Sequence, residues 1–196
     1  MELYLLIFFF AYLLLTMALP RWRVVRQTGQ KVFVVPNDDS AQGFIGKVFR
    51  WLFLMVLVAL LVNALVPSWK PYLLPAYFLD IVFVKWVGLI LLHLSLLMII
   101  IAQYQMNRSW RVGFDEKQKT ELITTGAFRF SRNPIFLGML MTMAGLFLVL
   151  PNALTFAVML LAYVVLQVQV RLEEVYLRQA HGEDYLEYGR RVGRWF

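Results

Sequence analysis

The sequence contains no cysteine and only two histidines, His93 and His181. The absence of cysteine excludes disulfides, thiolate metal sites, iron–sulfur clusters and thiol catalysis. Two histidines without clustered carboxylates do not make a histidine-rich metal site, so we expect no bound metal. Charge is also scarce, since Asp, Glu, Lys and Arg make up 16% of the residues and hydrophobic residues 61%. This composition is typical of membrane proteins and not of soluble domains.

The charged residues that are present give a net charge of +7. A basic protein can bind nucleic acid, but here Lys and Arg flank apolar runs and form no separate polar patch. We therefore expect the basic residues to contact anionic lipid headgroups and expect no nucleic-acid partner.

Five apolar runs are about long enough for helices that cross the hydrocarbon layer of a membrane. The runs are Leu3–Leu19, Trp51–Val66, Trp86–Ala102, Ile135–Leu150 and Ala153–Val170. The first is not typical of a signal peptide, because Glu2 precedes it and basic residues follow it. Only Pro151 and Asn152 separate the last two, which predicts a tight helical hairpin. The predicted fold is all-α, a polytopic membrane protein with about five transmembrane helices.

The positions of Lys and Arg predict the orientation, because cytoplasmic loops are enriched in these residues. Residues 21–50 contain six, residues 104–134 six and residues 171–196 five, which is 17 of the 19. The opposite loops contain only Lys70 and Lys85. We therefore expect the N-terminus outside and the C-terminus in the cytoplasm. The connection from Pro67 to Lys85, rich in aromatic residues, is predicted to lie at the membrane interface.

The C-terminal hairpin, residues 135–170, should bring two polar segments to the same membrane surface. These are the loop before it, residues 104–134, and the tail after it, residues 171–196. We divide the chain into an N-terminal region of three transmembrane helices, residues 1–103, and a second region, residues 104–196. A site for a polar small molecule is expected where loop and tail meet, as a pocket on the cytoplasmic face.

The loop ends in features typical of a turn followed by a helix N-terminus. Gly126 permits a turn, Pro134 suits the first turn of a helix, and Asn133 before it is predicted to be the N-cap. Free N–H groups at that helix end and the neighbouring Arg132 would suit a carboxylate or phosphate. The alternative is a capped helix whose Arg132 reaches toward lipid phosphates.

The tail begins with two adjacent carboxylates, Glu173 and Glu174, just beyond the last apolar run. Two carboxylates turned toward lipid would be costly, which favours a functional role for the pair. The alternative for Glu174 is helical ion pairing, because Arg171 lies three residues before it and Arg178 four after it.

A short second helix is predicted in the tail, because Gly182 should end the first and acidic residues follow it. Tyr185, Tyr188 and Arg191 recur every three residues and should share one face of this helix. An amphipathic helix lying at the membrane interface is the alternative explanation of that face.

Together, these segments resemble the isoprenylcysteine carboxyl methyltransferase and phospholipid methyltransferase superfamily of integral membrane enzymes. The resemblance covers about residues 103–196. It rests on NRSW at 107–110, G-x-F-x-x-S-R-N-P-x-F-x-G at 126–138, the Glu-Glu pair, and G-E-D-Y-x-x-Y and R-V-G-R in the tail. It implies methyl transfer from S-adenosyl-L-methionine to a lipid-like or small hydrophobic acceptor, such as an isoprenylcysteine carboxylate, a phospholipid amine or a thiol. The implied partners are membrane lipids and a lipophilic or lipidated substrate.

The resemblance also implies roles for single residues. It implies that the cofactor-binding residues are Gly126, Phe128, Arg132, Asn133, Pro134, Gly138, Glu173, Tyr185, Tyr188 and Arg194, and the catalytic residues Arg132, Glu173, Glu174 and Arg191. The family usually has His where this chain has Asn133, and often Tyr where it has Phe136. Asn cannot act as a base near neutral pH, so Glu173, Glu174 or a tyrosine would serve if the acceptor must lose a proton.

Two other functions compete with the methyltransferase. A membrane reductase of the sterol reductase type, which uses NADPH, resembles this C-terminal half around the Arg-x-Pro turn. The short tail and the Glu-Glu pair favour the methyltransferase over it. A non-catalytic scaffold or transporter subunit would explain the helices but not the polar residues gathered on one face.

His93 lies in the middle of the third apolar run. Ionisable residues inside a membrane are candidates for function. A single hydrogen bond to another helix explains this histidine equally well, and we interpret it as structural.

Overall fold

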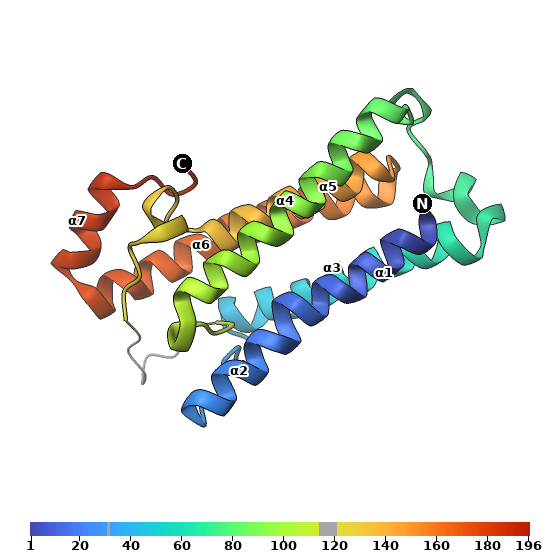
Figure 1. Cartoon of the computed structure of the whole chain (residues 1–196). Coiled ribbons are helices and arrows are strands. Elements are labelled where there is room, and N and C mark those ends of the chain that lie inside the picture. Colours follow the sequence, from blue (N-terminus) through green and yellow to red (C-terminus); the bar gives the residue numbers. More distant parts are fainter. Residues whose placement is uncertain (31, 114–120) are drawn as a thin grey trace.

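The computed structural model describes residues 1–30, 32–113 and 121–196, and every long element in them is a helix (Figure 1). The α-helices are α1 Glu2–Leu13, α2 Leu19–Thr28, α3 Ala41–Leu65, α4 Val82–Met106, α5 Pro134–Val149, α6 Ala153–His181 and α7 Glu183–Arg191. A π-helical turn, η1 Leu14–Ala18, joins α1 to α2, and short 3₁₀ turns are η2 Pro67–Leu73, η3 Tyr77–Leu79, η4 Asn107–Ser109 and η5 Gly126–Arg129. The predicted all-α fold is confirmed.

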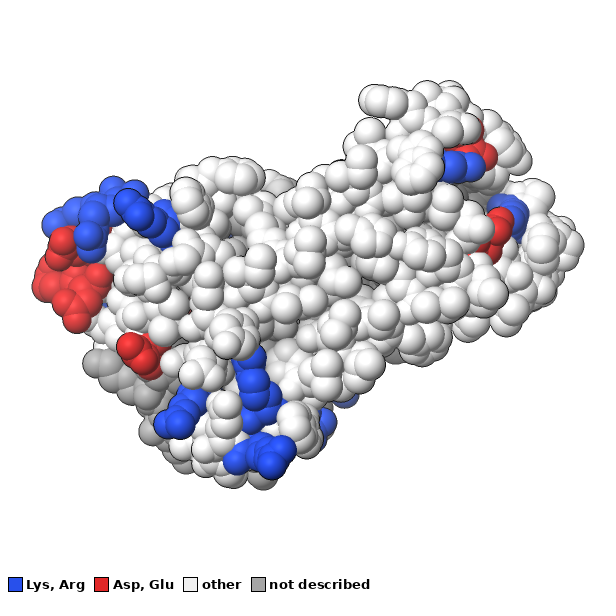
Figure 2. Space-filling view, viewed as in Figure 1, with Lys and Arg blue, Asp and Glu red and all other residues white. Residues whose placement is uncertain are grey.

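Four helical segments are long and apolar enough to cross a membrane: Glu2–Thr28, Ala41–Leu65, Val82–Ser109 and Ala153–His181. A fifth apolar helix, α5, is shorter, with 16 residues. Charged side chains gather at the two ends of the elongated molecule and leave an uncharged surface between them (Figure 2). The chain is therefore a polytopic membrane protein with four to five apolar helices. Three of the basic residues used to predict its orientation, Lys31, Lys117 and Lys119, lie outside the described residues.

Most of the helices extend beyond the apolar runs that predicted them. The first continues through its basic residues to Thr28 and ends where Gly29 adopts a positive φ of 67°. Helix α6 continues past Val170 to His181, with Gly182 as its C-cap, as expected. An apolar run marks the part of a helix that lipid or core covers, whereas hydrogen bonding and capping decide where the helix ends.

The predicted hairpin between α5 and α6 is confirmed. Asn152 caps α6, since its side chain accepts from the backbone N–H of Thr155 at 3.0 Å and its own N–H donates to the Thr155 hydroxyl at 3.4 Å. This reciprocal pair is a capping box, which fixes the direction in which the helix begins. The outer connection packs on the same turn, because the N–H of Ala76 donates to the carbonyl oxygen of Pro151 at 2.8 Å.

Helices α4 and α5 pack closely because glycines face each other across their contact. A Cβ atom added at Gly88 would lie 2.7 Å from the carbonyl oxygen of Gly145, and one at Gly145 would lie 2.9 Å from that of Gly88. A little further along, the hydroxyls of Ser95 and Thr142 are 2.8 Å apart in a hydrogen bond. Small residues and buried hydroxyls are the usual means by which helices associate in membranes. This contact holds the short helix α5 against the long helix α4.

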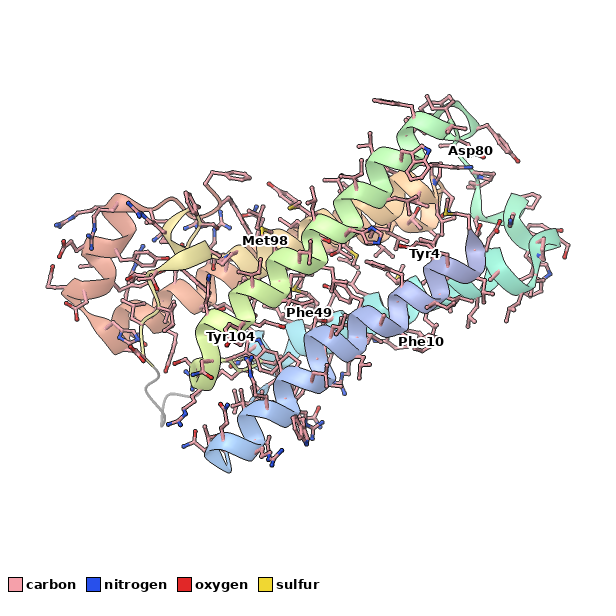
Figure 3. All side chains as sticks on the ribbon, in the orientation of Figure 1. Tyr4, Phe10, Phe49, Asp80, Met98 and Tyr104 are labelled. Atoms are coloured by element: carbon pink, nitrogen blue, oxygen red, sulfur yellow. The ribbon has the colours of Figure 1, made fainter. Side chains whose placement is uncertain are left out.

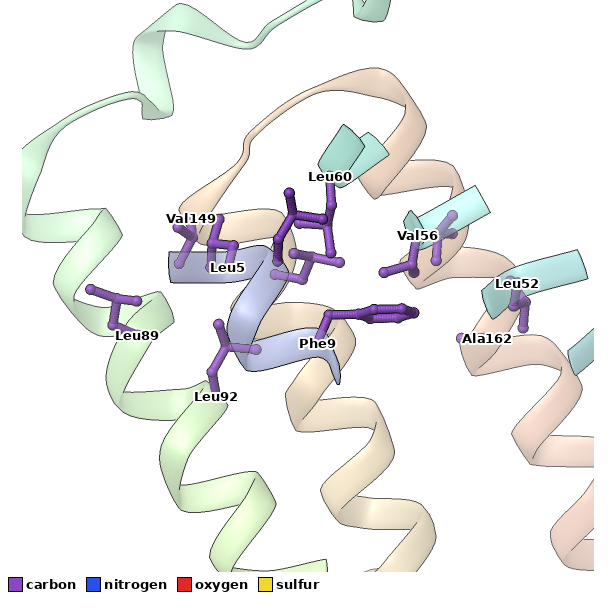
Figure 4. Close-up of a cluster of buried hydrophobic side chains, with 12 residues drawn as sticks. Leu5, Phe9, Leu52, Val56, Leu60, Leu89, Leu92, Val149 and Ala162 are labelled. Carbon is purple, nitrogen blue, oxygen red and sulfur yellow. The ribbon is translucent and has the colours of Figure 1, made fainter. Parts of the chain in front are cut away.

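An apolar core connects the first helix to the other helices (Figure 4). Its buried members come from α1, α3, α4, α5 and α6: Leu5, Leu6, Phe9, Leu52, Val56, Leu60, Leu89, Leu92, Leu146, Val149, Val158 and Ala162. Beside it, His93 of α4 makes a hydrogen bond of 2.6 Å to the hydroxyl of Tyr4 of α1, which is labelled in Figure 3. The structural interpretation of His93 agrees with this interhelical contact.

Candidate functional site

A buried carboxylate, Glu174, joins the loop, the hairpin and the tail. Oε1 of Glu174 accepts from Nε of Arg194 at 3.0 Å, and Oε2 accepts from Nη2 of the same arginine at 2.6 Å. Arg132 from the loop places its Nη2 3.1 Å from Oε1. The Glu174 side chain is only 4% exposed. A buried carboxylate needs such compensation, so the two arginines neutralise a charge that would otherwise be costly.

Main-chain hydrogen bonds attach the tail to the loop at the same place. The N–H of Arg132 donates to the carbonyl oxygen of Gly193 at 3.0 Å. The carbonyl oxygen of Arg194 accepts from the Asn133 side-chain amide at 3.0 Å and from the Ser131 hydroxyl at 3.3 Å. The tail therefore covers the start of α5 and shields it from water.

Asn133 occupies the N-cap position of α5, as predicted, but its side chain does not cap the helix. Its amide group instead donates to the tail carbonyl of Arg194. Its backbone N–H donates to the Ser131 hydroxyl at 3.1 Å. The prediction missed this because the tail supplies a nearby acceptor that the local sequence does not show.

Two tyrosines of α7 are buried against the loop. The hydroxyl of Tyr188 donates to the carbonyl oxygen of Phe128 at 2.6 Å, and the guanidinium of Arg132 lies 5.9 Å from the centre of the Tyr185 ring. The tyrosine face of α7 therefore packs on protein and does not face lipid, unlike the face of an amphipathic interfacial helix. Burial raises the pKa of each hydroxyl to about 12, so both remain protonated near neutral pH. Neither tyrosine is then suited to accept a proton.

A cavity of about 250 Å³ lies between Arg132 and helix α7. Its lining residues are Arg132, Arg178, Tyr185, Leu186, Gly189 and Arg190. Gly189 makes room for the guanidinium of Arg132, because a Cβ atom at position 189 would lie 2.8 Å from Nη1 of Arg132. Nε of Arg132 is enclosed and has no hydrogen-bond partner among the described residues. The three arginines suit a carboxylate or phosphate group.

Gly126 forms the expected turn and also anchors the loop to α4. It adopts a positive φ of 64°. The next residue, Ala127, donates its N–H to Oε1 of Gln105 at 2.8 Å. A side chain at position 126 would collide with the Gln105 side chain. Both the positive φ and this close approach favour glycine here.

Several residues expected at the site lie elsewhere or are paired differently. Gly138 lies in α5 against the side chain of Ile99. The structure therefore does not bring it to the Glu174 cluster, which consists of Glu174, Arg132 and Arg194. Arg191 is exposed and its Nη2 lies 3.5 Å from Oε1 of Glu187, one turn earlier on α7. The buried face of α7 therefore contains the two tyrosines but not Arg191, because a spacing of three residues falls about 60° short of a full turn at each step.

The two carboxylates of the pair have different surroundings. Glu174 forms its salt bridges with Arg132 and Arg194, so helical ion pairing with Arg171 and Arg178, the alternative explanation, does not account for its position. Glu173 is half-buried, and Arg111 is the basic group that attracts it electrostatically. Pro134 is buried at the first turn of α5, as expected.

The sequence did not identify four residues of this region. Arg178, Gly189 and Arg190 line the cavity, and Ser131 links the loop to the tail. A serine two residues before the predicted N-cap, able to accept from the Asn133 N–H, was the one local signal for Ser131. Arg178 lies on α6 and Gly189 and Arg190 lie on α7, and only the packing of these helices brings the three residues together. In the described ranges, no group of three His, Cys, Asp or Glu residues could hold a metal ion.

Comparison with known proteins gives a family for the region that contains Arg132 and Glu174. Residues 83–184 match the family described as phospholipid methyltransferase. Two proteins of Oryza sativa, one from subsp. indica and one from subsp. japonica, are each 31% identical over 115 residues. Both are named probable protein-S-isoprenylcysteine O-methyltransferase. The match covers 56% of this chain and 59% of each relative, so the chain spans about three fifths of the length of these curated relatives.

Proposed function

Because the chain belongs to the phospholipid methyltransferase family of membrane methyltransferases, we propose that it methylates a lipid-like or small hydrophobic acceptor at the Glu174 cluster. The observation that carries the proposal is the pairing of one buried carboxylate with Arg132 and Arg194 beside an arginine-lined cavity. S-adenosylmethionine supplies an activated methyl group on a positively charged sulfur when it is bound. We further propose that this site faces the cytoplasm.

The cavity residues fit the polar groups of that cofactor. The enclosed Nε of Arg132 is a donor without an acceptor, and a carboxylate would provide one. Arg178 and Arg190 add positive charge for the same anionic group. We propose that Arg132 binds the cofactor carboxylate and that Glu174 orients Arg132.

The main task of the protein in an in-line methyl transfer is to align the reacting groups and exclude water. The hydrogen bonds from Arg132 and Asn133 to the tail carbonyls close the site on one side. Tyr188 attaches α7 to the loop through the Phe128 carbonyl oxygen. From these contacts we propose a positioning role for Asn133 and Tyr188.

The need for a base depends on the acceptor. A carboxylate acceptor arrives ionised, whereas an ammonium or thiol must first lose a proton. Both oxygens of Glu174 are already bound to guanidinium groups, and the hydroxyls of Tyr185 and Tyr188 remain protonated. We therefore assign proton acceptance, where the acceptor requires it, to the carboxylate of Glu173.

The acceptor is proposed from the names of the family and the relatives. The family name indicates a phospholipid and the rice proteins an S-isoprenylcysteine group. Both are lipophilic and would reach the site from the membrane. Purified protein supplied with radiolabelled S-adenosylmethionine and either a phospholipid or an isoprenylcysteine analogue would identify the class by which acceptor gains label.

Cofactor binding in detergent tests the site itself. We expect saturable binding of S-adenosylhomocysteine and no saturable binding of NADPH. Arg132→Ala should weaken the binding at least about tenfold, because it removes charge-assisted hydrogen bonds. The matched control is Arg129→Ala, an exposed arginine of the same loop, which should bind like the wild type. Binding of NADPH alone would favour the reductase, and equal effects of the two substitutions would contradict the proposed site.

A further inference from the structure

The basic residues at the two ends of the molecule have different partners. At the end with the N-terminus, Nζ of Lys70 lies 2.9 Å from Oε1 of Glu2, and Lys85 pairs with Asp80. At the other end, helix α2 carries three arginines, and no carboxylate of the described residues pairs with any of them. Figure 2 shows blue side chains at the lower edge of the molecule, where Figure 1 places α2 and the end of α4.

Each arginine of α2 instead lies over an aromatic ring. Distances from the guanidinium carbon to the ring centre are 5.3 Å for Arg21 over Phe33, 5.4 Å for Arg23 over Tyr104 and 5.2 Å for Arg26 over Trp22. Such contacts hold the side chains, and no carboxylate in the described part of the chain compensates their charge. An anion is therefore expected beside them.

Arg23 is the most firmly held of the three. Its Nη2 donates to the carbonyl oxygen of Gln103 at 2.9 Å. The Gln103 side chain is in turn fixed, because its Nε2 donates to the carbonyl oxygen of Thr16 in the π-helical turn at 2.8 Å. Contacts from α4 and from the first helix therefore hold the guanidinium in one orientation, which is favourable for binding an anion.

Two polar atoms of this contact have no hydrogen-bond partner among the described residues. They are Nε of Arg23, a donor, and Oε1 of Gln103, an acceptor. Both are enclosed, so leaving them unpaired costs free energy. Arg23 is partly exposed, so a ligand at this surface that carries both an acceptor and a donor would satisfy the two atoms.

The position of the contact indicates where that ligand comes from. Arg23 follows the end of the first apolar run at Leu19, and the neighbouring Trp22 is exposed. Tyr104, labelled in Figure 3 near the end of α4, is exposed as well. Exposed Trp and Tyr next to arginine at the end of a transmembrane run are typical of the lipid headgroup layer.

We propose that Arg23, Gln103 and Tyr104 form a binding site for the headgroup of an anionic phospholipid that also carries a hydrogen-bond donor, such as phosphatidylglycerol. The phosphate accepts from Nε of Arg23, and a headgroup hydroxyl donates to Oε1 of Gln103. Phosphatidylcholine has no such donor and no net negative charge. The site is separate from the Glu174 cluster, so the proposal does not depend on the methyltransferase activity.

Lipid titration of the purified full chain in detergent, followed by native mass spectrometry, tests the site. We expect phosphatidylglycerol to bind at least about tenfold more tightly than phosphatidylcholine, since charged hydrogen bonds distinguish the two. Arg23→Ala should remove most of this preference. Arg26→Ala removes the same charge from the exposed side of α2 and should change the affinity less than about twofold.

Two further measurements guard against a variant that does not fold and distinguish a bound lipid from a free phosphate compound. Arg23→Lys retains the charge but not Nε and should still lose about fivefold, which serves if Arg23→Ala does not fold. Soluble glycerol phosphate should fail to displace the lipid at equal concentration, and displacement would instead assign the site to a free phosphate compound. Equal losses for Arg23→Ala and Arg26→Ala, or no preference for phosphatidylglycerol, would overturn the proposal.

Discussion

At Glu174, one carboxylate is shared by two arginines that come from segments far apart in the sequence. Arg132 precedes the hairpin, and Arg194 follows α7. The side chain lies in a nearly water-free environment, where an ion pair is strong but the removal of one partner is costly. The folding of the tail and the integrity of the site therefore depend on the same residue.

Substitution of Glu174 by Gln is expected to destabilise the protein by about 3 kcal/mol or more. The reason is that Arg132 and Arg194 would lose their common anionic partner while remaining largely buried. Thermal or denaturant unfolding in detergent measures the change. Glu187→Gln is the control, since Glu187 is 67% exposed and its pair with Arg191 should contribute less than about 1 kcal/mol. Comparable losses for the two variants would contradict this account of Glu174.

The sequence predicted which residue types form the site better than it predicted their partners. The positions of Arg132, Asn133 and the Glu-Glu pair follow from a turn, a proline and the end of an apolar run. The main-chain carbonyl oxygens of Gly193 and Arg194 have no sequence signal, although they bind the loop. Arg191 was expected on the face of the tyrosines because its spacing matches theirs, but it is the last residue of α7 and its side chain is exposed.

Among the helices, α5 depends most on its neighbour. It has 16 residues, fewer than the four long helices, and its glycines face α4. A short helix gains little from lipid contact alone and is held here by close backbone packing. The start of α5 carries the loop of the candidate site, so the α4–α5 contact also positions Arg132.

Gly88→Val should separate α4 from α5 and lower the stability by about 1–3 kcal/mol, the range for overpacked cores. The added side chain would meet the carbonyl oxygen of Gly145 and the side chains of Leu148 and Val149. The unfolding temperature in detergent measures the effect. Leu97→Val on the exposed side of α4 is the control and should change the stability by less than about 0.5 kcal/mol. A wild-type unfolding temperature for Gly88→Val would show that the close contact is unimportant.

Hydropathy located all five apolar helices and the hairpin, because lipid and core both require apolar side chains. It did not show that α6 continues to His181 or that the first helix continues to Thr28. Beyond the apolar run, a helix is held by its own hydrogen bonds and by contacts with other segments. Those contacts, such as the one between Arg23 and Gln103, join residues distant in sequence and have no periodic signal.

As a whole, the molecule is elongated, with charge at both ends and an uncharged middle (Figure 2). The ends differ in character, since the lysines of one are paired with carboxylates, whereas the arginines of α2 have no carboxylate partner among residues 1–30, 32–113 and 121–196. Unpaired arginine attracts the anionic lipids of the cytoplasmic leaflet. The orientation predicted from the sequence therefore remains our expectation for the folded protein.

Single cysteines can test this orientation cleanly, because the natural chain has none. We expect Gln27→Cys at the end of α2 to react with a membrane-impermeant maleimide only after the cells are opened. Tyr77→Cys, in the exposed connection between α3 and α4, should react in intact cells. The reverse pattern would show that the orientation is opposite to the predicted one. Labelling of both positions from the same side would show that the segment between them, which contains α3, does not cross the membrane.

The π-helical turn Leu14–Ala18 sets the rotational phase of the arginines that follow it. A π turn contains one more residue than an α turn, and each helical residue advances the helix by about 100°. Deleting one residue of this turn would restore a regular α-helix and leave the apolar run almost as long. The wide turn absorbs the extra residue, so this deletion would leave α2 in the same orientation. A regular α-helix through the same residues would instead rotate α2 by about 100° relative to α1 and carry Arg23 away from Gln103. The orientation of the α2 arginines therefore depends on how the π turn absorbs one extra residue within the apolar run, and hydropathy does not detect this residue.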